Sequence, residues 1–301
     1  MKPEGREIHV ACITPTDDQG LVDFQRLERK VEWLKGYTQV TGISVLGSTG
    51  EGPSLSPRMR GQVRRHVALL KSPEMLLSSG VFGCSVDEVL EEIEDAAESG
   101  VDVVLLPPPF YYSMNSKEVY HFYLNVCDKS LLPLIIYNIP SFTKVSIPED
   151  VVQELASHNQ VAGIKDSSRD FAYFQRVVNR TRTLEFKVLT GSDDMLLAST
   201  IVGGHGTICA SANIVPHVIS DLYRAIDDEN WVLARELQTS LADLGDICRS
   251  LGGFRGWKLA QELMGAGSRN VFSPSLSALK DDSRLSSTLS QYSLLWNTAG
   301  S

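Results

Sequence analysis

The sequence lacks the basic clusters and the long apolar runs that mark nucleic-acid-binding and membrane proteins. Its 301 residues include 28 Lys and Arg against 37 Asp and Glu, for a formal net charge of −9, and they contain no basic run. Binding to nucleic acid or to an anionic membrane requires clustered basic side chains, so we expect neither partner. The longest apolar run, at residues 101–110, includes three consecutive prolines and is far too short to span a bilayer.

Cysteine is scarce, and the pattern of cysteines argues against a disulfide framework. The five cysteines are odd in number, widely separated and without a C-x-x-C pair. They are Cys12, Cys84, Cys127, Cys209 and Cys248. We therefore predict buried free thiols in a reducing compartment. The first 15 residues also lack an apolar stretch long enough for a secretory signal, so the expected location is the cytoplasm.

What is present is an alternation of short β-branched runs and longer segments of helical period. The predicted strands cover residues 8–13, 42–46, 75–81, 101–106, 132–137, 161–165, 186–189 and 205–209. The predicted helices cover residues 23–37, 57–70, 86–99, 117–129, 148–158, 171–180, 194–202 and 214–227. Start signals support several helices, such as Ser85 with Glu88 three residues on, Ser116 before Lys117, and Pro148.

This alternation predicts an α/β fold. Strands that are apolar on both faces, each followed by a helix, indicate a parallel sheet. Eight such units favour a closed (β/α)₈ TIM barrel, although an open doubly wound sheet is the alternative. Further helices are expected at 231–251 and 254–264, separated by a stop at Gly252 and Gly253 and followed by a Ser-rich tail. We assign 1–228 to the catalytic barrel and 229–301 to a C-terminal helical extension packed on it.

Barrel enzymes place their chemistry at the carboxyl ends of the strands, and Lys165 ends the apolar strand VAGIK. A lysine held in a poorly hydrated barrel mouth is disfavoured as ammonium, which makes a nucleophilic amine available. The alternative is a structural lysine paired with Asp166 or Asp193 on the rim. Position alone does not decide between the two.

Other strand ends carry weaker signals. Tyr137 ends the preceding strand, so its phenol is expected near Lys165, where it serves either as a proton carrier or as an aromatic core residue. The segment GSTGEG at 47–52 offers amides and the hydroxyls of Ser48 and Thr49 to a carboxylate, although such loops are also common turns. Asp193 and Asp194 are expected to cap the helix that follows them.

The remaining titratable residues carry less signal. The six histidines show no metal-ligand spacing, so no metal is expected. Lys258, in a C-terminal helix, is interpreted as structural.

Together these segments resemble the dihydrodipicolinate synthase/N-acetylneuraminate lyase family of class I, Schiff-base aldolases. The similarity spans about residues 9–216 and extends more weakly through 252–265. The order of the matching pieces and their placement at strand ends make the resemblance specific. These pieces are GSTGEG at 47–52, PPFYY at 108–112, YNIP at 137–140, GIKDSS at 163–168, LTGSDD at 189–194 and GGHGTI at 203–208.

The resemblance implies a role for each matching residue. Lys165 is the Schiff-base lysine, and Tyr137 transfers protons. Ser48 and Thr49 hold the carboxylate of pyruvate or another 2-oxo acid and relay protons. Tyr111 reaches into a neighbouring subunit's site, which implies a homodimer or homotetramer.

Further positions match the family's pocket, and no cofactor is implied. Gly191 and Ile208 match positions that line the substrate pocket. Ser167 and Asp193 are similar to groups that contact the polyol tail in N-acetylneuraminate lyase.

One departure from the family pattern bears on the substrate. In the synthases an arginine after the YNxPS segment binds the second carboxylate, and here that position is Phe142, with Lys144 as a poorer substitute. We therefore predict a lyase of carbohydrate metabolism that joins or separates pyruvate and an aldehyde, with a 2-keto-3-deoxy sugar acid as substrate. The alternatives are dihydrodipicolinate synthase, N-acetylneuraminate lyase, a dehydratase of deoxy-keto sugar acids, and a catalytically silent barrel that binds a 2-oxo acid.

Overall fold

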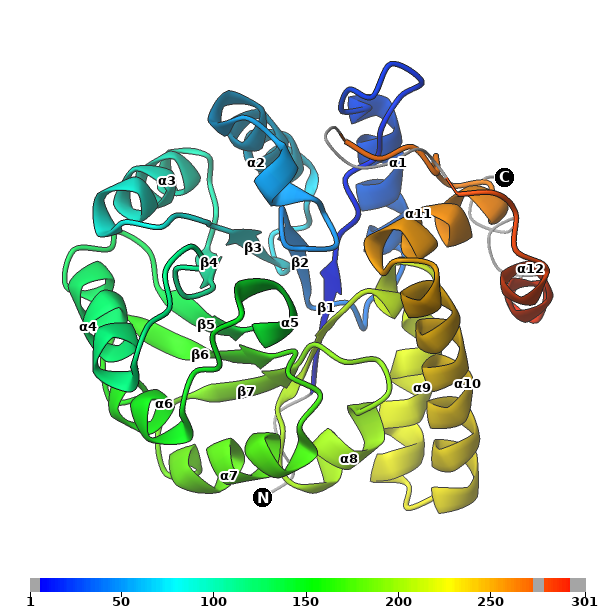
Figure 1. The fold of residues 1–301 in the computed structure, drawn as a ribbon. Helices are drawn as coiled ribbons and strands as arrows, with labels where there is room; N and C mark the ends of the chain where they lie inside the picture. The colour runs from blue at the N-terminus through cyan, green and yellow to red at the C-terminus, as the bar shows by residue number, and fades with distance from the viewer. Residues whose placement is uncertain (1–5, 273–278, 293–301) are drawn as a thin grey trace.

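The computed structural model describes residues 6–272 and 279–292, and its centre is a closed barrel of eight parallel strands in sequence order (Figure 1). The predicted TIM barrel is confirmed, and the open-sheet alternative is wrong. The strands are β1 (Glu7–Ala11), β2 (Gly42–Val45), β3 (Leu76–Gly80), β4 (Val103–Leu106), β5 (Leu134–Asn138), β6 (Val161–Asp166), β7 (Lys187–Thr190) and β8 (Gly206–Cys209).

Helices surround the barrel and cover the outer faces of the strands (Figure 1). They are α1 (Phe24–Lys35), α2 (Pro57–Leu70), α3 (Val86–Glu98), α4 (Ser116–Cys127), α6 (Glu149–Leu155), α7 (Phe171–Thr181), α8 (Leu196–Ile201) and α9 (Pro216–Asp227). Three shorter elements occupy the connections: the 3₁₀ turns η1 (Gly52–Ser54) and η2 (Ser211–Asn213), and the helix α5 (Pro140–Thr143).

Side-chain caps define where several of these helices begin. Ser85 accepts a hydrogen bond from the amide of Glu88, as the sequence predicts. The expected start of α4 was wrong by one residue, because Asn115 is the cap and forms a reciprocal capping box with Glu118. Ser116 is instead the first helical residue.

Two strands start later than predicted because their first residues belong to turns. The amide of Val101 bonds to the carbonyl of Ala96 and so closes the end of α3. The amide of Leu132 bonds to Oγ of Ser130. The predicted starts at 101 and 132 therefore lie two residues before the observed strands, which begin at Val103 and Leu134.

The buried core has two parts, one between strands and helices and a smaller one inside the barrel. The inner part includes Ala11, Leu105, Tyr137, Leu189 and Ile208. Since side chains alternate across a strand, these residues fill the barrel interior in layers. The carboxyl-terminal layer of this interior is the floor of the cavity described below.

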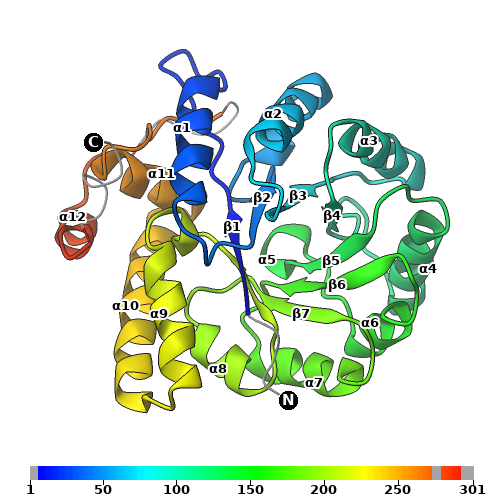
Figure 2. The same cartoon turned by 180° about the vertical axis from the view of Figure 1, so that it is seen from behind.

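Three helices follow the barrel: α10 (Trp231–Ser250), α11 (Phe254–Leu263) and α12 (Ser283–Ser290). Both views show α10 alongside α9 (Figures 1 and 2). The tail was expected to be simply Ser-rich, but α12 forms there, because Asp282 caps it and Leu285 and Leu289 are buried. In the described part of the chain, no helix is long and apolar enough to cross a membrane.

The five cysteines are free, as expected, but their burial was only partly predicted. Cys12, Cys127, Cys209 and Cys248 are buried. Cys84 is exposed, because it lies in the loop between β3 and α3 rather than on an inward face.

Near the amino-terminal end of the barrel, His9 on β1 is buried against β2. A Cβ on Gly42 would lie 2.8 Å from Cδ2 of the His9 ring, so Gly42 makes room for the imidazole. Burial lowers the pKa of His9 to about 4, although Glu7 opposes the shift. The charged imidazolium is therefore strongly disfavoured in the folded protein.

This burial predicts a loss of stability at acidic pH. Between pH 6.5 and about 4, the unfolded chain binds a proton at residue 9 that the folded protein does not. The free energy of unfolding should therefore fall through this window, by about 3 kcal/mol from His9 alone, and be fully restored above pH 6.5. Urea unfolding at several pH values should show a shallower dependence for His9→Gln.

The control for this experiment is His121→Gln. His121 is exposed, so its replacement should leave the wild-type pH dependence intact. Burial also lowers the pKa of His205 and His217, so the slope in His9→Gln should be reduced rather than abolished. An unchanged slope in His9→Gln would contradict the assignment.

Candidate active site

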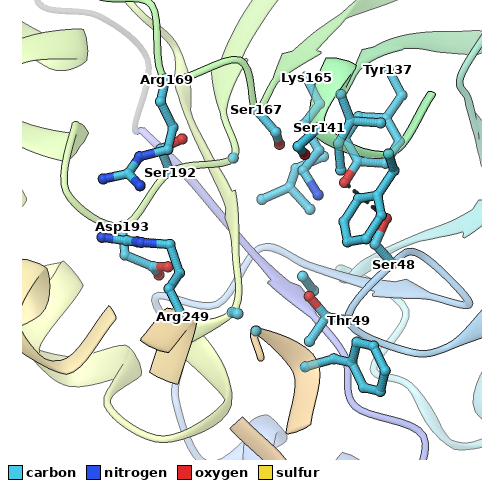
Figure 3. Close-up of a pocket in the computed structure, with 18 of the residues that line it drawn as sticks. Ser48, Thr49, Tyr137, Ser141, Lys165, Ser167, Arg169, Ser192, Asp193 and Arg249 are labelled. Carbon is cyan, nitrogen blue, oxygen red and sulfur yellow. Dashed lines mark hydrogen bonds between the residues drawn. The ribbon is translucent and has the colours of Figure 1, made fainter. Parts of the chain in front are cut away.

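A cavity of about 190 Å³ opens at the carboxyl ends of the strands, which is the catalytic end of such barrels. Most of its walls come from the ends of β5 and β6 and from the loops that follow β2, β5, β6 and β7 (Figure 3). Residues of β1, β8, α10 and α11 also contribute. It contains eight of the nine residues singled out by sequence for catalysis or substrate binding. They are Ser48, Thr49, Tyr137, Lys165, Ser167, Gly191, Asp193 and Ile208.

Lys165 and Tyr137 are register partners on the adjacent strands β6 and β5. This pairing places Nζ of Lys165 4.4 Å from the centroid of the Tyr137 ring, as the sequence predicts. Lys165 is only 5% exposed, although it lines the cavity. A buried amine beside a phenol, both facing an open cavity, suits nucleophilic attack with local proton transfer.

The expected alternative, a lysine paired with a neighbouring acid, is wrong. Asp166 accepts hydrogen bonds from Nδ2 of Asn138 at 2.8 Å and from Oγ of Ser168 at 2.9 Å. Asp193 accepts one from the amide of Ser211 at 2.9 Å. In the described part of the chain, neither acid forms an ion pair with Lys165, whose amine faces the cavity instead.

The loop after β2 brings Ser48 and Thr49 to the same cavity. Oγ of Ser48 lies 3.4 Å from the phenolic oxygen of Tyr137, within reach of a hydrogen bond (Figure 3). The loop approaches other backbone closely, because a Cβ on Gly52 would lie 2.0 Å from the carbonyl oxygen of Leu46. Glycine is therefore required there for the loop to take this shape.

Gly191 and Ile208 shape the space around the amine. A Cβ on Gly191 would lie 2.1 Å from Oγ of Ser167 and 2.8 Å from Cε of Lys165. Glycine at 191 thus leaves Lys165 and Ser167 room to occupy the cavity wall. Ile208 is fully buried and forms part of the apolar floor.

The two acids after β7 do not cap the following helix as predicted. Helix α8 begins at Leu196 and has no side-chain cap. Asp193 turns inward and accepts a hydrogen bond from Ser211, and its burial raises its pKa while the bonds from Ser211 oppose that rise. Asp194 pairs with Arg169 and with Arg249.

Sequence reasoning missed the cationic wall of the cavity. Arg169 and Arg249 line it on the side away from Tyr137 and Ser48 (Figure 3). Arg169 follows Lys165 by four residues, so its position in the loop after β6 could have predicted that it lines the cavity. Arg249 comes from α10, and no local pattern shows that this helix returns to the barrel mouth. Ser141, Ser192, Phe254 and Trp257 also line the cavity.

Tyr111 is the one expected site residue that this chain does not bring to the cavity. It is 76% exposed and is not among the lining residues.

A second, largely apolar cavity of about 280 Å³ lies beside Ser48 and shares Phe142 with the first. Lys144, the suggested substitute for the synthase arginine, points its amine at the carbonyl of Ser141 and does not line the main cavity.

The arrangement suits a carbonyl substrate that carries an acidic group. A buried amine and a phenol face the cavity, two hydroxyls stand beside them, and the guanidinium groups of Arg169 and Arg249, both paired with Asp194, lie opposite. Among the described residues, no group of three or more His, Cys, Asp or Glu side chains is placed to hold a metal ion. The groups present are those of amine-based covalent catalysis.

Comparison with known proteins agrees with this chemistry. The chain is 30% identical over 281 residues to the 4-hydroxy-tetrahydrodipicolinate synthase of Gluconacetobacter diazotrophicus, covering 91% of this chain and 92% of that protein. It is 30% identical over 207 residues to the 2-dehydro-3-deoxy-D-gluconate/2-dehydro-3-deoxy-phosphogluconate aldolase of Picrophilus torridus, covering 69% and 76%.

The structure is similar to the pyruvate complex of dihydrodipicolinate synthase from Acinetobacter baumannii. The TM-score is 0.86 at 26% identity, and the match covers 98% of each chain. The model of the dihydrodipicolinate synthetase family matches residues 4–291. The chain therefore belongs to the dihydrodipicolinate synthetase family and is a carbon–carbon lyase of the class I aldolase type.

Proposed function

We propose that this protein is an aldolase that cleaves or forms a 2-keto-3-deoxy sugar acid through a Schiff base between Lys165 and pyruvate. The observation that carries the proposal is the position of the Lys165 amine. It lies in the cavity at the mouth of the barrel, beside Tyr137 and without an ion-pair partner among the described residues. The named activity of the Picrophilus relative and the pyruvate bound in the Acinetobacter structure support the same chemistry.

The reaction begins when the neutral amine of Lys165 attacks C2 of the 2-oxo acid. The carbinolamine loses water and becomes a protonated imine, which accepts electrons. In the cleavage direction the C4 hydroxyl loses its proton, the C3–C4 bond breaks, and its electrons pass toward the imine nitrogen. An aldehyde leaves, and the remaining enamine takes a proton at C3. Water then hydrolyses the imine and releases pyruvate.

Tyr137 and the loop after β2 serve these steps. The phenol of Tyr137 lies beside Lys165 and within 3.4 Å of Ser48, so protons pass between substrate oxygen, phenol and hydroxyl. Ser48 and Thr49 bind the pyruvate carboxylate and fix the orientation of C2. This assignment gives Thr49 a place in both binding and proton relay.

Polar groups that line the cavity are suited to a hydroxylated aldehyde. Ser141, Ser167 and Ser192 supply hydroxyls, and Asp193 supplies a buried carboxyl group. Phe142 replaces the arginine that binds a second carboxylate in the synthases, and it cannot supply paired donors. Arg169 and Arg249 also line the cavity, but both already pair with Asp194. A sugar-acid substrate therefore fits this lining better than aspartate semialdehyde does.

A second copy of the chain completes the proposed site. Phe110, Tyr111 and Tyr112 are exposed in the single chain. The apolar cavity beside Ser48 offers a place for an aromatic ring from a neighbour. We therefore assign Tyr111 to the partner's site and propose a homodimer or homotetramer, working in the reducing conditions of the cytoplasm that five free cysteines suit.

The amine of Lys165 should be the point of covalent attachment. Borohydride reduction with pyruvate should add one pyruvate-derived group to the peptide that contains Lys165, as read by mass spectrometry. Lys165→Ala should fold normally, lose this adduct and lose at least about a thousandfold in turnover. The control is Lys144→Asn, because Lys144 is an exposed lysine near the mouth and Asn tolerates its positive φ. An unmodified Lys165 in wild type would overturn the proposal.

Substrate choice should follow from the side chain at position 142. The wild-type enzyme should release pyruvate from one or more 2-keto-3-deoxy sugar acids and condense pyruvate with aspartate semialdehyde poorly. Phe142→Arg should raise the relative efficiency with aspartate semialdehyde by about tenfold or more, because it restores a carboxylate partner. Efficient condensation by wild type, with no sugar acid cleaved, would instead favour the synthase alternative.

Mixing two inactive variants tests whether Tyr111 acts in the partner's site. Tyr111→Ala and Lys165→Ala should each have little activity, and mixed assemblies should recover part of it, because one site in each hybrid then has both residues. Tyr112→Ala, equally exposed at 76%, should retain activity on its own. Failure of the mixture to recover, with hybrid assemblies demonstrated by native mass spectrometry, would show that Tyr111 does not act across subunits.

A further inference from the structure

Lys258 on α11 forms an ion pair deep inside the protein. Its side chain is fully buried, and its ammonium pairs with Glu51, whose side chain is 1% exposed. The same ammonium donates to the carbonyl of Asn270 at 2.8 Å and lies 4.5 Å from the centroid of the Phe272 ring. Lys258 therefore joins α11 and the segment that follows it to Glu51.

That residue, Glu51, belongs to the loop that presents Ser48 and Thr49 to the cavity. Its φ is 53°, and Leu46 at the other end of the loop has a φ of 58°. Left-handed backbone is unfavourable for side-chain-bearing residues and persists only where the surroundings hold it. The loop is thus bracketed by two strained residues.

The side chain of Glu51 is held on both of its oxygens. One pairs with Lys258, and the other accepts a hydrogen bond from the amide of Phe272 at 3.1 Å. Both anchors come from the C-terminal part of the chain, beyond the barrel. Elsewhere in the loop, Oγ1 of Thr14 donates to the carbonyl of Gly50 at 2.7 Å. The C-terminal anchors thus hold the strained end of the loop.

Burial makes this anchor stiff and costly to break. Removing one partner of a buried pair leaves an uncompensated charge, whereas removing both does not. Burial lowers the pKa of Lys258, and the nearby Glu51 carboxylate opposes that shift. Helix α11 also lines the active-site cavity through Phe254 and Trp257, so the helix that carries the anchor is itself part of the site.

We propose that Lys258 and Glu51 are positioning residues: their buried ion pair holds the strained loop 46–52 so that Ser48 and Thr49 meet the substrate carboxylate. This inference rests on the proposed function, since it takes pyruvate as the ligand of that loop. It assigns the C-terminal extension a role in substrate binding.

The test measures the pyruvate concentration that gives half-maximal borohydride-trapped adduct on Lys165. This readout needs no knowledge of the aldehyde. In Glu51→Gln, in Lys258→Met and in the double variant, the half-saturating concentration should rise by about tenfold or more. The maximal trapped fraction at saturating pyruvate should stay near wild type. Lys258→Arg, which keeps the charge, should recover much of the lost affinity.

Thermal unfolding separates positioning from stability. The single variants each leave one buried charge unpaired and should be less stable, whereas the double variant should regain much of that stability. Its pyruvate affinity should nevertheless stay low. Glu92→Gln is the matched control, because it disrupts the buried ion pairs of Glu92 with Arg60 and Arg64, none of which lines the active-site cavity. It should lower stability without changing pyruvate affinity.

The outcomes are distinct. If wild type forms no adduct, the proposed function fails. If wild type forms it and the double variant binds pyruvate with wild-type affinity, the pair is only a stabilising element and this inference fails. Should no variant fold, hydrogen exchange on wild type decides: trapped pyruvate must protect residues 254–263 together with 47–52, and protection confined to 47–52 overturns the proposal.

Discussion

The site depends on one constraint, the closure of eight parallel strands into a barrel. Within the barrel, parallel pairing sets β5 beside β6 in a register that places Tyr137 opposite Lys165. Because both residues lie near the carboxyl ends of their strands, their side chains meet in the same interior layer. Neither residue needs a flexible loop to reach the other, so the amine and the phenol are held together before substrate arrives.

Two residues that have no side chain shape the cavity and its neighbouring loop. Gly191 stands where a Cβ would collide with Ser167 and Lys165, and Gly52 stands where one would collide with the carbonyl of Leu46. Gly191 leaves room for the amine itself, and Gly52 lets the loop after β2 fold closely against the backbone of Leu46. Under the proposed mechanism, the covalent chemistry of Lys165 would depend on the absence of atoms around it as much as on the groups present.

The sequence predicted the parts of this arrangement that follow from local pattern. Eight strand-and-helix units predict the barrel, and the position of Lys165 at a strand end predicts its place in the mouth. The sequence could not predict where Asp193 and Asp194 would point. Their contacts to Ser211, Arg169 and Arg249 come from three other segments, which only the folded chain brings together. Capping propensity gave the wrong answer because the two carboxylates make these tertiary contacts instead of a cap on α8.

The same distinction explains why Lys258 looked structural. In the sequence it is an isolated lysine in a helix more than 200 residues from Glu51. The two residues are related by their burial as a pair of opposite charges, and only the folded structure shows which charges are buried. A fully buried lysine is stable only if a partner offsets its desolvation, and here the partner lies in the loop beside the reacting groups. The barrel alone therefore supplies the amine and the phenol, while the segments beyond it hold the loop that, in our proposal, orients the substrate.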